Sequence, residues 1–172
     1  MAAIAVLAIA ACGAFARAAA PQLIDQTGHH FTLSSLRGHP LVVTFVAARC
    51  TDACPLINAR FARAQALFER EHIDARLLTI TLEPEHDTPA VMRELAARFS
   101  AAPRRWLLAT GPVKDVHFLL NAFGVMGNRD EHTTFVYVFD AHGQLRERIL
   151  GSSVLDTELA ADLQTIARAT VR

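Results

Sequence analysis

The sequence has no excess of charge of either sign. Its 172 residues include 17 lysines and arginines and 17 aspartates and glutamates, so the formal net charge is zero. A surface that binds nucleic acid or an anionic membrane needs a strongly basic field. The balanced charge therefore argues against nucleic acid as a partner. The length is typical of one domain with a short appendage.

Long apolar runs are absent after residue 20, where no stretch approaches the roughly 18 apolar residues of a membrane helix. The N-terminus differs, because every residue from Ala2 to Ala16 is apolar or glycine. A run of this length that ends in the small residues Ala18–Ala20 is typical of a secretory signal. We therefore expect a signal over residues 1–20. Residues 21–172 would form one exported domain, in the periplasm or at the outer face of the cell membrane.

Cysteine is scarce, with three residues at positions 12, 50 and 54. The first, Cys12, allows two interpretations. The string Ile9-Ala10-Ala11-Cys12 matches a bacterial lipoprotein box, in which Cys12 would carry a lipid anchor at the new N-terminus. Alternatively, cleavage near Ala18–Ala20 would remove Cys12 with the signal. Both interpretations place the domain outside the cytoplasm.

Apolar periodicity predicts alternating strands and helices. A small hairpin is expected over residues 23–31, followed by a connecting loop over residues 33–38. The predicted strands are 41–46, 75–82, 106–109, 133–139 and 145–150, and the predicted helices are 55–71, 89–99, 113–123 and 156–168. Thr88 is expected to cap the second helix, with Pro89 in its first turn. In the first helix, the spacing places four apolar residues towards one side: Leu56, Phe61, Leu67 and Phe68. This order predicts an α/β fold, with a central mixed sheet flanked by helices and an N-terminal β-hairpin.

Cys50 and Cys54 follow directly after the predicted strand 41–46 and enter the next helix. Backbone N–H groups at a helix N-terminus favour negative charge, so a thiol placed there loses its proton more easily. Two cysteines four residues apart lie on one side of a helical turn and can share one disulfide or one metal ion. A structural disulfide is the plain alternative. Because its loop would be worth only about 2 kcal/mol, we favour a reactive or metal-binding pair.

Several segments resemble the Sco/SenC family. Phe45–Pro55 is similar to the family's Cys-x-x-x-Cys-Pro motif after the first central strand. Glu83–Pro89 resembles its Asp-Pro-x-x-Asp-Thr-Pro segment, and Asp25–Gly28 with Phe31–Leu33 resembles its N-terminal hairpin. The likeness extends over nearly the whole chain after the signal and implies a thioredoxin-like fold.

The resemblance also implies a third site residue. In the family a histidine precedes the strand that ends in an Asp-x-x-Gly hairpin, and here His132 precedes the strand that ends at Asp140–Gly143. The implied site binds one copper ion through Cys50, Cys54 and His132, and the two cysteines also carry thiol–disulfide chemistry. Two thiolates and one imidazole suit copper(I), a soft ion. The other seven histidines have no such assignment.

The resemblance implies a copper-binding assembly factor, more a metallochaperone than an enzyme. Such a protein would deliver copper to the binuclear copper site of a cytochrome oxidase subunit, or reduce the cysteines of that site. It would receive copper from a donor protein. The alternative is a metal-free thiol–disulfide oxidoreductase of the cell envelope, acting on other thiol proteins, in which Cys50 attacks and Cys54 resolves. A peroxiredoxin-like peroxidase is disfavoured, because its motif requires a proline where this chain has Ala47.

Overall fold

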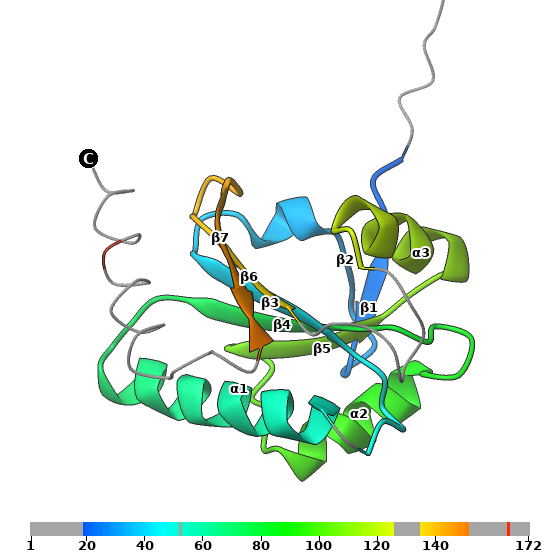
Figure 1. Ribbon diagram of the computed structural model, residues 1–172, viewed down its shortest axis with the longest axis horizontal. Coiled ribbons are helices and arrows are strands. Elements are labelled where there is room, and N and C mark those ends of the chain that lie inside the picture. Colours follow the sequence, from blue (N-terminus) through cyan, green and yellow to red (C-terminus); the bar gives the residue numbers. More distant parts are fainter. Residues whose placement is uncertain (1–18, 52, 126–134, 152–164, 166–172) are drawn as a thin grey trace, which may run out of the picture.

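The computed structural model describes four parts of the chain, residues 19–51, 53–125, 135–151 and 165. Its strands are β1 (Leu23–Asp25), β2 (His30–Phe31), β3 (Leu41–Val46), β4 (Arg76–Thr81), β5 (Trp106–Thr110), β6 (Phe135–Phe139) and β7 (Leu145–Leu150). Its helices are α1 (Ala53–Arg70), α2 (Pro89–Arg98) and α3 (Val113–Ala122), with a short 3-10 helix η1 (Leu33–Leu36). The strands form one sheet in the order β2-β1-β5-β4-β3-β6-β7 (Figure 1).

The centre of the sheet is parallel and its two sides are antiparallel. β3 and β5 both run parallel to β4, whereas β6 runs antiparallel to β3 and β7 antiparallel to β6. All six residues of β3 are buried. Alternate side chains of a strand point to opposite faces, and here Val42 and Val46 contact one core cluster while Leu41, Val43 and Phe45 contact the other.

Helices cover both faces of the sheet. α1 and α2 lie on one face, and α3 and η1 lie on the other (Figure 1). The buried side of α1 repeats every three or four residues, as expected of an amphipathic helix. Its apolar members are Cys54, Ile57, Phe61, Ala64 and Phe68. The prediction that Leu56 belongs to this side is wrong. Its side chain is 52% exposed, because one residue along a helix turns the side chain by about 100°.

The structure confirms the predicted α/β class and element order. β1 and β2 pair as the predicted hairpin, and the described strands and helices begin and end within two residues of the predicted limits. Thr88 is the N-cap of α2, where its side chain accepts a hydrogen bond from the Val91 N–H at 3.4 Å. The expected loop at 33–38 contains η1 instead. The predicted helix 156–168 lies outside the described residues except for Thr165.

The register of β3 and β6 decides which segments meet at one edge of the sheet. Thr44, near the end of β3, lies opposite Val136, near the start of β6. The Thr44 hydroxyl also donates to the Phe135 carbonyl at 3.0 Å. β6 therefore begins at the edge where β3 ends and where the chain continues towards Cys50. None of the described helices has the length and apolar character needed to cross a membrane.

Candidate functional site: a dithiol at a strand-to-helix junction

The two cysteines predicted as site residues lie together after β3. Cys54 is in the first turn of α1, and Cys50 precedes that helix. Both are free thiols. Cys54 is only 2% exposed, whereas Cys50 is half-buried. The Cys50 side chain is among the causes that raise the pKa of the Cys54 thiol, so the two thiols are neighbours.

A tight turn brings Cys50 back towards the helix. The Cys50 N–H donates to the Ala47 carbonyl at 3.1 Å. The Ala47 backbone also acts on the Cys54 thiol, whose pKa it lowers. Ala47 thus interacts with both cysteines, and because it directly follows β3, which lies in the core, the strand holds the turn in place. The position of the dithiol follows from a rigid strand rather than from a mobile loop.

The Cys54 thiol holds its proton unusually tightly. Burial raises its pKa to about 12 from the ordinary value of 9.0, and the hydrogen bond from Cys50 and the nearby charges of Cys50 and Asp87 act in the same direction. The backbone of Ala47 opposes them but is outweighed. The expectation that a thiol at this helix N-terminus ionises more easily is therefore wrong for Cys54. Its proton leaves readily only when another partner, such as a metal ion or a second sulfur, takes its place.

Asp87 braces the cysteine turn and was not among the predicted site residues. It is 1% exposed. Its Oδ2 atom accepts hydrogen bonds from the Ala48 N–H at 3.0 Å and from the Thr81 hydroxyl at 2.6 Å. These bonds tie the chain before Cys50 to the end of β4. Its Oδ1 atom is buried and has no hydrogen-bond partner among the described residues, an arrangement that costs free energy.

The signal for Asp87 was present in the sequence, in the Glu83–Pro89 segment. That segment supports the family resemblance, but the sequence alone does not reveal that Asp87 is buried and lies close to Cys54. The carboxylate lies 33 positions after Cys54 in the chain. Only the parallel pairing of β3 with β4 brings the two ends together.

His132, the third predicted ligand, lies outside the described residues, as does Cys12. Within residues 19–51, 53–125 and 135–151, no three or more His, Cys, Asp or Glu side chains gather in a metal-binding arrangement. A copper site formed by Cys50, Cys54 and His132 together therefore stays a prediction. The two sulfurs that the structure does place fit a soft ion, since thiolates are the donors that copper(I) prefers.

The fold and the dithiol define a class, a thioredoxin-like domain with two cysteines at the junction of a central strand and a helix. The SCO1/SenC family model matches residues 14–168 of the chain. The chain belongs to the SCO1/SenC family, as the resemblance implied.

The chain is similar in sequence or in fold to several known proteins. The SCO2-like protein RP587 of Rickettsia prowazekii is 29% identical over 134 residues, which cover 72% of this chain and 64% of the relative. The chain thus spans less than two thirds of the length of this relative. A SCO1/SenC family lipoprotein from Bacillus anthracis superposes with a TM-score of 0.77 at 24% identity, covering 85% of this chain and 92% of that one. ScoI of Bradyrhizobium japonicum, solved with copper bound, superposes with a TM-score of 0.72 at 24% identity, covering 84% and 96%.

Proposed function

We propose that this protein binds one copper ion through Cys50, Cys54 and His132 and acts as an assembly factor for the copper site of a cytochrome oxidase. The observation that carries the proposal is the pair of free thiols at the junction of β3 and α1, where Cys50 acts on the pKa of Cys54 and a backbone hydrogen bond closes the turn. Membership of the SCO1/SenC family supports it. So does the fold shared with BsSco, which is described as a member of the Sco family of cytochrome c oxidase assembly proteins.

The topology of the sheet supports His132 as the third ligand. β6 begins at the edge where β3 ends, and His132 precedes the first residue of β6, Phe135, by three positions. Three residues of chain reach at most about 11 Å. A histidine at this distance along the chain could therefore reach the edge of the sheet where the cysteine turn lies. The copper-bound structures of proteins with this fold, from Bradyrhizobium japonicum and yeast, agree with a copper site in this scaffold.

The protonation of the dithiol would make copper binding depend on pH. Below pH 9 the buried Cys54 carries a proton, so copper(I) must displace it, and uptake would release protons to solvent. Copper(I) accepts three ligands, and a two-sulfur, one-nitrogen set leaves it accessible to a thiolate of a partner protein. Ligand exchange with such a partner would then deliver the ion to the oxidase subunit.

A second function, thiol–disulfide exchange, is supported by the unequal exposure of the two cysteines. The half-buried Cys50 is the sulfur a partner can reach, whereas Cys54 is buried. The Cys50 thiolate would attack a partner disulfide and release one partner thiol. Cys54, losing its proton, would then attack the mixed disulfide, forming the Cys50–Cys54 disulfide and releasing the second partner thiol. Two electrons and two protons pass to the partner, which would reduce the cysteines of a copper site.

A competition titration with a chromophoric copper(I) chelator tests the first function. The reduced protein carries Cys12→Ser, so that only Cys50 and Cys54 remain. We expect one copper(I) per chain, and loss of tight binding in Cys50→Ser and Cys54→Ser. Affinity weaker than micromolar in the parent protein would refute copper binding. A protein that fails this test but still reduces a small disulfide such as oxidised glutathione would be an oxidoreductase only.

We further propose that the domain works outside the cytoplasm, anchored by a lipid on Cys12. The support is the apolar N-terminus with its lipoprotein box, together with the likeness to a lipoprotein of the same family from Bacillus anthracis. Mass spectrometry of protein extracted from membranes should find diacylglycerol on Cys12. A mature chain that begins after Ala18–Ala20 would show instead that the signal is removed and the domain is released.

A further inference from the structure

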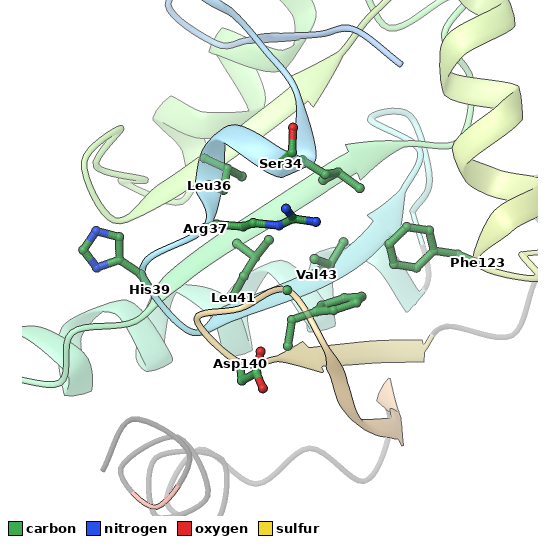
Figure 2. Close-up of a pocket in the computed structure, with 11 residues that line it drawn as sticks. Ser34, Leu36, Arg37, His39, Leu41, Val43, Phe123 and Asp140 are labelled. Atoms are coloured by element: carbon green, nitrogen blue, oxygen red, sulfur yellow. The ribbon is translucent and has the colours of Figure 1, made fainter. Parts of the chain in front are cut away.

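A pocket lies on the face of the sheet opposite to α1, and neither cysteine lines it. It is formed between η1, strands β3 and β6, the turn that follows β6 and the end of α3 (Figure 2). Its volume is about 210 Å³. Its walls are mostly apolar side chains: Leu33, Leu36, Leu41, Val43, Phe123 and Phe139.

The pocket is built from fixed parts. The Tyr137 hydroxyl donates to the Phe123 carbonyl at 2.9 Å, which fixes the end of α3. The rings of Phe123 and Phe139 meet edge to face, with centroids 5.8 Å apart. On the other side, the Gly38 N–H donates to the Ala141 carbonyl at 2.8 Å and joins the segment after η1 to the turn after β6. The cavity is therefore a feature of the packed fold rather than a gap beside a loose loop.

One cation, Arg37, extends across this pocket. Figure 2 shows its side chain running between Ser34 and Val43, with the guanidinium directed towards Phe123. Gly143 packs closely against the Arg37 side chain. A Cβ atom at this position would lie only 3.1 Å from the Arg37 Nε atom. Among the described residues, no hydrogen bond or ion pair involves the Arg37 guanidinium.

The acidic residue of the lining, Asp140, is already neutralised. Its Oδ1 atom accepts hydrogen bonds from the N–H groups of His142 and Gln144, both at 2.9 Å. Its Oδ2 atom accepts from the Arg146 guanidinium at 2.8 and 2.6 Å. Asp140 therefore has no strong attraction left for Arg37, and the positive charge over the pocket is uncompensated within the described part of the chain.

We propose that this pocket binds a small carboxylic acid with an apolar body, such as an aromatic or medium-chain acid. Apolar walls favour a hydrocarbon group over water. The volume exceeds the roughly 150 Å³ cavity that takes up benzene but falls below the range of about 300 Å³ and more for drug-sized ligands, so one ring or a short chain fits. The Arg37 guanidinium supplies the planar pair of donors that a carboxylate prefers. The inference does not depend on copper or on the dithiol.

Three probes with the same apolar body and different charge test the proposal: 3-phenylpropionate, 3-phenylpropanol and 3-phenylpropylamine. Binding to the full reduced chain is followed by amide chemical shifts in NMR titrations. We expect saturable shifts from the acid at residues of η1, β3 and the end of α3, with Cys50 and Cys54 unaffected. The alcohol should bind roughly tenfold or more weakly, since it forms no charge-assisted hydrogen bond, and the amine more weakly still.

Two variants at exposed positions separate the charge from the cavity. Arg37→Gln should lower the affinity for the acid roughly tenfold to a hundredfold and leave the alcohol unchanged. Ser34→Trp, which places a ring at the mouth of the pocket, should abolish binding of both. Cys50→Ser should bind the acid like the parent and thereby separates this site from the dithiol. Equal binding of acid and alcohol, an unchanged affinity in Arg37→Gln, or no saturable shift up to about 10 mM acid would each overturn the proposal.

Discussion

Raising the pH should destabilise the reduced protein through one buried thiol, Cys54. In the folded state its pKa is about 12, against an ordinary value of 9.0. Below pH 9 the folded and unfolded chains both carry the neutral thiol, so its ionisation does not affect stability. Between pH 9 and 12 the unfolded chain loses the proton and the folded chain keeps it, so the free energy of unfolding falls as the pH rises.

The size of this effect follows from the pKa difference. Each pH unit in the interval costs about 1.4 kcal/mol, so the loss is about 2 kcal/mol near pH 10.5 and about 4 kcal/mol over the whole interval. Urea unfolding of the reduced protein at about pH 8 and about pH 10.5 measures it, because the midpoint shifts with stability at constant m. Cys54→Ala removes the thiol and should lose about 2 kcal/mol less between the two pH values than the parent.

The matched control for this experiment is Asp87→Asn. It keeps a hydrogen-bond acceptor and removes one of the charges that raise the Cys54 pKa, so it should show a smaller loss at high pH than the parent. A parallel fall of stability in the parent and in Cys54→Ala would refute the reasoning. That result would mean that burial does not raise the pKa of Cys54 in the folded protein.

Three further predictions concern the turn and the core. Asp87→Ala should lower the free energy of unfolding by about 2–3 kcal/mol in urea unfolding, since two buried donors lose a charged acceptor; a loss below about 0.5 kcal/mol would contradict the bracing role. Burial opposes ionisation of Asp140, but hydrogen bonds and Arg146 outweigh it and lower the pKa of this carboxyl. The parent should therefore lose stability as the pH falls below about 4, Asp140→Asn should lose less in acid unfolding curves, and equal losses would exclude the ion pair. Phe61→Ala, at a site with 0% exposure, should cost about 3–5 kcal/mol, whereas Leu56→Ala at 52% exposure should stay within about 0.5 kcal/mol; equal costs would show that the helix is packed differently.

The fold was predictable from local patterns in the sequence. The apolar run Leu41–Val46 is a strand buried on both faces, and Thr88 with Pro89 starts a helix. Both signals act over a few residues, through propensity, capping and periodicity, so they survive without knowledge of the tertiary structure. The error at Leu56 has the same origin, because an apolar residue one step from the buried side looks like part of it.

The site was only partly predictable, because the burial and the pKa of its residues depend on tertiary packing. The spacing of Cys50 and Cys54 predicted a dithiol, but not that Cys54 is buried and holds its proton. Asp87 acts on the cysteine turn from the segment after β4, the strand that pairs in parallel with β3. The cavity beside Arg37 forms only because η1 packs near β6. Contacts of this kind join segments far apart in the chain and leave no periodic trace in the sequence.

X-ray absorption spectroscopy of the copper(I)-loaded protein tests the central claim most directly, because it counts the sulfur and nitrogen atoms bound to the ion. The measurement compares the parent with His132→Ala and with His142→Ala, whose histidine is exposed on the turn after β6. We predict two sulfurs and one nitrogen in the parent and in His142→Ala, and loss of the imidazole in His132→Ala alone. Identical spectra for all three proteins would contradict a copper site made from Cys50, Cys54 and His132.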